Sequence, residues 1–180
     1  RWVLRVSVNS AAFPAEGDIF AIKSRLKSRL DAWGYTAICD KKSGLTESIG
    51  RLDFAMDFLM SADFELEPDA VVFRGTKRDF LDGAEAHWRG RRVTGLTIGK
   101  MPNRQVVIYD KTADIAAKRK DYWWSVWGLD KAETQENGAR VWRVELRAGK
   151  KFLRDVWRLR SFQDLEDMAG DMFADTLCKV

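Results

Sequence analysis

The sequence predicts an α+β domain built on a central antiparallel β-sheet with helices packed on one face. Three observations lead to this class: short segments rich in β-branched and aromatic residues, apolar residues at helical spacing between them, and a hairpin-like loop between two segments. The predicted strands are residues 2–8, 50–58, 70–74, 93–99, 104–110 and 139–147. The predicted helices are residues 18–33, 111–127, 150–159 and 162–178.

Local residue patterns justify these elements in order along the chain. Residues 2–8 (WVLRVSV) are rich in β-formers, and residues 18–33 carry aliphatic side chains near helical spacing. Residues 86–92 (AHWRGRR) combine charge with glycine and predict a loop. Residues 100–103 (KMPN) predict the hairpin loop, and Asp110 is placed to cap the helix predicted to follow it.

Length and composition predict one domain spanning residues 1–180, because such a chain buries a sufficient core without staples. The first residue is Arg rather than Met, so we expect a fragment of a longer protein. One histidine, His87, and two distant cysteines, Cys39 and Cys178, exclude a zinc finger and fit a reducing cytoplasm. The sequence contains no long uncharged apolar segment, so it predicts no membrane span.

Basic residues are concentrated in one part of the chain. The net charge is +4, but residues 100–160 carry 15 Lys and Arg against 8 Asp and Glu, and residues 161–180 carry 1 against 5. The basic part also holds five of the eight tryptophans. Cations interleaved with aromatic rings are typical of nucleic-acid surfaces, because they contact phosphates and stack on bases. A solvated face over an aromatic core explains the pattern equally well.

Strand alternation predicts a polar face on the sheet. In strands 50–58, 104–110 and 139–147 the apolar residues share one face, which helices must cover. If these strands are neighbours, the opposite face gathers Asp53, Asp57, Tyr109, Arg143, Glu145 and Arg147. Carboxylates bind Mg²⁺ or Mn²⁺, arginines bind phosphate and a hydroxyl supplies a nucleophile, so this set predicts metal-assisted phosphoryl transfer. A polar solvated face is the alternative interpretation.

Strand geometry limits which carboxylates can share one metal ion. Asp53 and Asp57 are four residues apart, roughly 13 Å along a regular strand, so both cannot bind the same ion directly. We favour Asp53 and Glu145 as ligands of Mg²⁺ or Mn²⁺. We expect Asp57 to support the metal site without contacting the ion, or to be a structural residue, unless the strand bends.

Four short motifs follow one another in a characteristic order: Gly50–Asp57 (GRLDFAMD), Thr94–Gly99 (TGLTIG), Val107–Lys111 (VIYDK) and Trp142–Arg147 (WRVELR). This order resembles the replication initiation factor family of the Rep_trans type. Its members are tyrosine initiators and relaxases of rolling-circle plasmids, integrative elements and filamentous phages. The resemblance covers about residues 50–150 and implies a fold of the HUH-endonuclease or Rep-like kind.

The resemblance implies a role for each matching residue. Tyr109 matches the tyrosine of the Y-D-K motif, which would attack a phosphodiester and retain the 5′ end as a phosphotyrosine. Lys111 matches its lysine, which would help to neutralise charge at the phosphate. Asp53 and Glu145 match acidic positions expected to hold the divalent ion, and Arg143 matches the arginine before that glutamate.

The chain departs from the family pattern in three ways. Asp114 stands where the family usually has glutamate, and Gly149 stands where it has arginine. The chain also lacks the histidine pair that related enzymes use for metal, so any metal site must depend on carboxylates.

Tyr122, beside three basic residues on the helix predicted over 111–127, is the rival nucleophile.

The predicted function is therefore a metal-dependent single-strand DNA endonuclease that initiates replication of a plasmid or phage. The alternative from another class is a non-catalytic, sequence-specific DNA-binding module, and a metal-dependent nuclease that uses water is a third. Expected DNA contacts are Arg51, Arg91, Arg92, Lys118, Arg143 and Arg147. Expected partners are DNA at an origin or nick site, with a second copy of the chain and a host helicase or polymerase as further candidates. The expected location is cytoplasmic.

Overall fold

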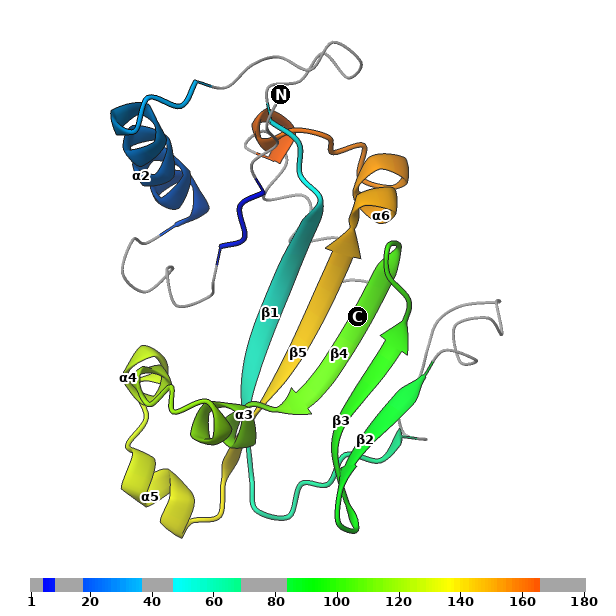
Figure 1. Cartoon of the computed structure of the whole chain (residues 1–180). Coiled ribbons are helices and arrows are strands. Elements are labelled where there is room, and N and C mark those ends of the chain that lie inside the picture. Colours follow the sequence, from blue (N-terminus) through cyan, green and yellow to red (C-terminus); the bar gives the residue numbers. More distant parts are fainter. Residues whose placement is uncertain (1–4, 9–17, 37–46, 69–83, 166–180) are drawn as a thin grey trace. The chain divides into compact units, whose positions relative to one another are not determined.

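The computed structural model describes residues 5–8, 18–36, 47–68 and 84–165 (Figure 1). The chain divides into two compact units, Arg1–Thr46 and Glu47–Val180. In the first unit, α2 (Ile19–Ala32) confirms the helix predicted over 18–33. Asp18 caps it by accepting hydrogen bonds from the backbone N–H groups of Phe20 and Ala21 at 2.8 and 2.7 Å. Residues 5–8 form no strand, and the rest of the strand predicted over 2–8 lies outside the described residues.

The second unit contains a five-stranded antiparallel sheet, which confirms the predicted α+β class. Its strands are β1 (Arg51–Met60), β2 (Glu85–Arg89), β3 (Arg92–Gly99), β4 (Arg104–Asp110) and β5 (Arg140–Gly149). They lie side by side in the order β1-β5-β4-β3-β2 (Figure 1). β5 thus enters between β1 and β4 although it comes last in the sequence. The strand predicted over 70–74 lies outside the described residues.

The main difference in the sheet is β2, because residues 86–92 were predicted to form a loop. Residues 85–89 instead pair with β3 across a tight turn at Gly90 and Arg91. Gly90 has φ 64°, a left-handed conformation that glycine adopts without a steric penalty. An edge strand exposes most of its side chains to water, so the charged residues of this segment are compatible with a strand although they are not typical of one.

The helices of the second unit are shorter than predicted. α3 (Lys111–Ala117) and α4 (Tyr122–Trp127) replace the single helix expected over 111–127, and Arg119, with φ 53°, lies between them. The polar α5 (Lys131–Glu136) was not predicted. α6 (Lys150–Asp155) covers only part of 150–159, and residues 162–165 are the described helical part of 162–178.

The apolar core lies on one face of the sheet, where α6 and the segment after it pack. Its buried members are Val106, Leu146, Ala148, Phe152, Leu153, Trp157, Leu159 and Leu165. Trp157 makes edge-to-face contacts with Phe54 and Phe152, with ring centroids 5.7 and 4.9 Å apart. This face agrees with the apolar alternation predicted for β1, β4 and β5.

The prediction that helices cover only one face is wrong at one end of the sheet. α4 contacts the polar face there through Trp123 and Trp127, because it carries three tryptophans whose rings need cover. Trp123, Trp124 and Ile115 form a second apolar cluster. In the described part of the chain, no helix combines the length and apolar character that crossing a bilayer requires.

Candidate functional site

The register of the sheet brings the predicted polar residues onto one face. Asp57, Arg143, Tyr109, Gly95 and His87 are successive partners across β1, β5, β4, β3 and β2, and they form the first row. The second row is Ala55, Glu145, Val107, Thr97 and Glu85, and the third is Asp53, Arg147, Gln105 and Gly99. All six residues that alternation assigned to the polar face therefore lie on neighbouring positions of one surface.

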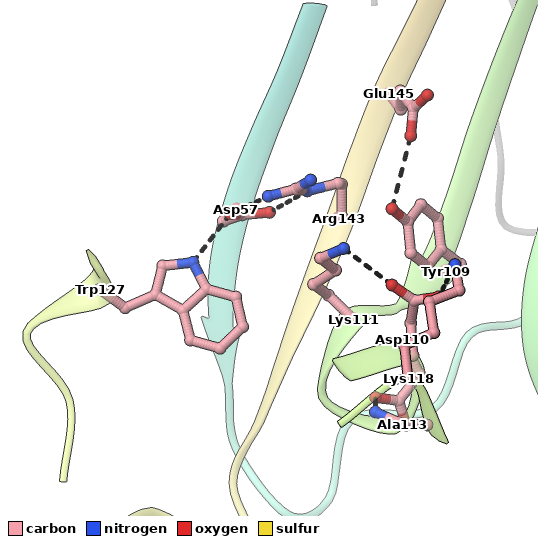
Figure 2. A network of polar contacts seen from close by, with 10 residues as sticks. Asp57, Tyr109, Asp110, Lys111, Ala113, Lys118, Trp127, Arg143 and Glu145 are labelled. Atoms are coloured by element: carbon pink, nitrogen blue, oxygen red, sulfur yellow. Dashed lines mark hydrogen bonds and ion pairs between the residues drawn. The ribbon is translucent and has the colours of Figure 1, made fainter. Parts of the chain in front are cut away.

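Asp57 and Arg143 form a two-point ion pair in the first row (Figure 2). The Nε and Nη2 atoms of Arg143 donate to the two carboxylate oxygens of Asp57, each at 2.6 Å. Trp127 on α4 donates from Nε1 to the same carboxylate at 2.9 Å. Burial opposes the charge of Arg143, but the hydrogen bonds that it donates to Asp57 prevail and raise its pKa.

Tyr109 lies beside Arg143 near the end of β4, and its hydroxyl points toward the second row (Figure 2). The hydroxyl donates to Oε2 of Glu145 at 3.4 Å. Burial, together with the negative charge of Glu145, raises the pKa of Tyr109 to about 12, although Arg143 opposes the shift. In this arrangement the side chain is therefore a neutral phenol at physiological pH.

Lys111 begins α3 and is buried, with 4% of the residue exposed. The N-cap is Asp110, as predicted, whose carboxylate accepts from the backbone N–H of Ala113 at 2.9 Å. Lys111 Nζ donates to Asp114 at 2.8 Å and lies 5.6 Å from the centre of the Tyr109 ring. Burial lowers the pKa of Lys111, and the positive charge of Arg143 adds to the effect.

A second group of charges surrounds Glu145. Arg147 donates from Nε to Oε1 of Glu145 at 2.9 Å. Arg51 forms a two-point pair with Asp53, and its Nη2 atom lies 2.5 Å from Asp53 Oδ2 and 3.8 Å from Glu145 Oε1. The guanidinium of Arg51 thus contacts the two carboxylates that the sequence favoured as metal ligands. The hydrogen bonds that Arg51 donates to Asp53 raise the pKa of Arg51, although burial opposes this shift.

The donor chemistry of Asp53 and Glu145 fits a divalent ion with few protein ligands. Both offer hard carboxylate oxygens near a single cationic atom, and Mg²⁺ often takes one or two carboxylates together with water and substrate phosphate. Among the described residues, no three His, Cys, Asp or Glu side chains gather closely enough to hold a metal ion. Asp57 stands apart from this pair, because both of its oxygens are bound by Arg143.

The predicted DNA contacts are distributed over different surroundings. Arg143 is buried and held by Asp57, whereas Arg51 and Arg147 are partly exposed beside the carboxylates. Lys118 pairs with Asp114 at the end of α3. Arg91 is exposed at the β2–β3 turn.

Arg92 differs from the other predicted DNA contacts. Its guanidinium lies over the Trp142 ring at 5.9 Å from the centroid. Trp142 precedes Arg143 on β5, so its side chain points to the opposite face of the sheet. Arg92 is accordingly separated from the polar cluster.

Gly95 keeps the space beside Tyr109 open. A β-carbon on Gly95 would lie 2.9 Å from the carbonyl oxygen of Ile108 and 3.2 Å from Cβ of Tyr109. His87 follows in the same row and interacts through Nε2 with Thr97 Oγ1 at 2.9 Å. Steric crowding by β4 therefore explains why the T-G-L-T-I-G motif has glycine at position 95.

The sequence did not identify Trp123 and Trp127 as neighbours of the site. The Arg143 guanidinium lies 4.6 Å from the centre of the Trp123 ring, and Trp127 is hydrogen-bonded to Asp57. The basic and aromatic composition of residues 100–160 was the available signal, but it did not specify these contacts. Tyr122, the rival nucleophile, is exposed on α4, and its ring lies against Trp123.

Comparison of the chain with protein-family models, curated proteins and solved structures gives no match.

Proposed function

We propose that this chain contains a DNA-nicking domain of the replication-initiator type, with Tyr109 as nucleophile. The observation that carries the proposal is the 3.4 Å contact between the Tyr109 hydroxyl and Glu145, on a face that also holds Arg143. Lys111 Nζ lies 5.6 Å from the centre of the same ring. A phenol with a carboxylate acceptor and nearby cations has the groups needed to form a phosphotyrosine.

The proposed reaction exchanges one phosphodiester for another. A bond forms between Tyr109 Oη and phosphorus while the bond from phosphorus to the 3′ oxygen breaks. The phenol proton leaves toward Glu145, and the departing 3′ oxygen takes up a proton from solvent. The 5′ phosphate stays on Tyr109, so the bond energy is retained for later rejoining.

Asp53 and Glu145 would hold a divalent ion in this proposal. Bound there, Mg²⁺ or Mn²⁺ would supply Lewis-acid stabilisation to the phosphate and favour the phenolate. The chain contributes the rest of the charge: Arg143 lies beside Tyr109, and its guanidinium is fixed by Asp57, whose carboxylate also accepts a hydrogen bond from Trp127. A guanidinium fixed before the substrate binds needs little reorganisation as charge develops on the phosphate.

A second candidate is a non-catalytic DNA-binding module, and two observations favour it. The pKa of Tyr109, raised to about 12, keeps the hydroxyl protonated and weakly nucleophilic. Asp53, Asp57 and Glu145 are each paired with an arginine. Under this candidate the polar face contacts the DNA backbone and no bond is broken.

Trapping of a covalent adduct separates the two candidates. The full chain is incubated with Mn²⁺ and a labelled pool of single-stranded DNA that contains a randomised segment, then run on a denaturing gel. The nicking proposal predicts a labelled band that migrates with the protein, lost in Tyr109→Phe and retained in Tyr122→Phe. Nicked DNA without linked protein would support a nuclease that uses water. DNA that is bound but never cut would support the binding module.

A further inference from the structure

The β2–β3 hairpin carries an exposed aromatic ring among arginines. Trp88 is 61% exposed, whereas most tryptophans of the sheet unit are buried or half-buried. Arg89, which ends β2, and Arg91, which lies in the turn that follows, are both exposed. A single exposed ring is common on protein surfaces, so the significance of Trp88 lies in its combination with neighbouring cations, which proteins that bind single-stranded nucleic acid use together with aromatic rings.

A surface pocket of about 440 Å³ lies against this ring. The hairpin side is formed by Trp88, Arg89, Arg91, Arg92 and Val93, and residues 65–68 complete the lining. The pocket combines three kinds of contact: an aromatic face, guanidinium groups, and the carboxylates of Glu65 and Glu67. It is therefore neither a purely apolar cleft nor a purely basic one.

We propose that this pocket holds an unpaired nucleotide of single-stranded DNA, with the base stacked on Trp88. Arginines contact the flanking phosphates, and carboxylates accept hydrogen bonds from the exocyclic amino groups of bases. A duplex has its bases stacked and paired, so it cannot offer a free base face to the ring. The pocket thus selects single strands over duplex, which a groove of cations alone does not do.

The inference rests on the proposed nicking function for its biological meaning, and the pocket belongs to the same sheet as Tyr109. His87, which precedes Trp88, shares a row with Tyr109 two strands away, so their Cα atoms lie roughly 10 Å apart. The pocket itself lies toward the opposite face, because its Arg92 lies over Trp142, so a strand bound there would have to pass around the edge strand β2 to reach Tyr109. The pocket would hold the single strand at this edge of the sheet, while Tyr109 would perform the chemistry.

Equilibrium binding tests the pocket separately from nicking. Fluorescence anisotropy of a labelled mixed-sequence single strand is measured without metal in a Tyr109→Phe background, so that binding alone is observed. We expect Trp88→Ala to weaken binding roughly tenfold or more, the range for loss of one base-stacking ring. Trp88→Phe should retain most of the affinity and Trp88→Leu should not. The control is Trp33→Ala, which removes a similarly exposed ring, 69% against 61%, from the other unit.

Several outcomes would overturn the inference. Equal affinity of Trp88→Ala and the Trp33→Ala control would exclude stacking at the hairpin. Equal affinity for the single strand and its duplex would show that phosphates alone are bound. Circular dichroism of Trp88→Ala is the folding control: a spectrum like that of the unmodified chain shows that a loss of affinity is not caused by misfolding. A chain that binds through Trp88 but forms no adduct would contradict the nicking proposal and leave the pocket supported.

Discussion

Asp57 and Arg143 face each other across β1 and β5 and form two hydrogen bonds of 2.6 Å, although they are 86 residues apart in the sequence. Arg143 is 6% exposed, so its charge depends on Asp57 for compensation. The pair joins the strand that carries Asp53 to the strand that carries Glu145. It also explains why Asp57 stands apart from the carboxylates that could bind metal.

Replacing Asp57 by Ala should destabilise the fold strongly, because it leaves a buried guanidinium without its partner. We expect a loss of about 3 kcal/mol in the free energy of unfolding, the lower end for a broken buried pair. Urea denaturation followed by tryptophan fluorescence measures it. The double variant Asp57→Ala, Arg143→Leu should recover part of the loss. The control, Asp155→Ala, breaks an exposed pair and should leave the urea midpoint unchanged. Equal destabilisation by Asp57→Ala and Asp155→Ala would contradict a special role for the buried pair.

Trp127→Phe tests the link between α4 and the ion pair. The substitution keeps an aromatic ring but removes the N–H that donates to Asp57 at 2.9 Å. Because Asp57 retains both bonds from Arg143, the expected cost is only about 1 kcal/mol in the free energy of unfolding. The same denaturation measurement applies, with Trp33→Phe as a control in the other unit. Additive costs of Trp127→Phe and Asp57→Ala would contradict a shared network.

The polar face could be predicted from sequence because strand alternation is a local property. β1, β4 and β5 keep regular pairing around Asp53, Tyr109 and Glu145, so their faces follow from residue order alone. The chain reads V-E-L-R and L-D-F-A-M-D with little ambiguity. Those strands are consequently the part of the site where prediction and structure agree.

The partners of each charge could not be predicted, because they depend on strand order and side-chain geometry. Alternation placed Asp57 and Glu145 on one face, but it could not show that Arg143 binds the first while Tyr109 contacts the second. The break in the helix after Tyr109 was also missed. It requires Arg119 in a left-handed conformation, which no local signal in K-R-K-D indicates.

The environment of Tyr109 predicts a late phenol titration. Because burial and Glu145 raise its pKa to about 12, the native state keeps this proton over a range in which the unfolded chain, with pKa near 10, has lost it. The stability from neutral Tyr109 is thus full below about pH 10 and lost as the pH rises toward 12. The difference in phenolate absorbance between the wild type and Tyr109→Phe should have its midpoint near pH 12. Glu145→Gln should move this midpoint down, and an unchanged midpoint would contradict the role of Glu145.

Gly95→Ala should disturb the site sterically. The added β-carbon would lie 2.9 Å from the carbonyl oxygen of Ile108 and 3.2 Å from Cβ of Tyr109. Neither atom is at the far end of a flexible side chain, so neither can move away easily. We expect a loss of about 1–3 kcal/mol, the range for overpacking. The matched control is Gly50→Ala, whose β-carbon meets nothing within 4 Å. Thermal unfolding of the two variants gives the comparison, and equal melting temperatures would exclude the steric argument.

Arg51→Gln tests whether Asp53 and Glu145 form a cation site. The Arg51 guanidinium contacts both carboxylates and competes with any other cation there. Its removal should therefore tighten Mn²⁺ binding, by about three- to tenfold for an interaction that is partly exposed to water. Isothermal titration calorimetry of the full chain measures the dissociation constant. Arg154→Gln, which opens an exposed pair far along the sequence, should change nothing. Adding Asp53→Asn to Arg51→Gln should abolish the gain, and a double variant that binds Mn²⁺ as tightly as Arg51→Gln would place the ion elsewhere.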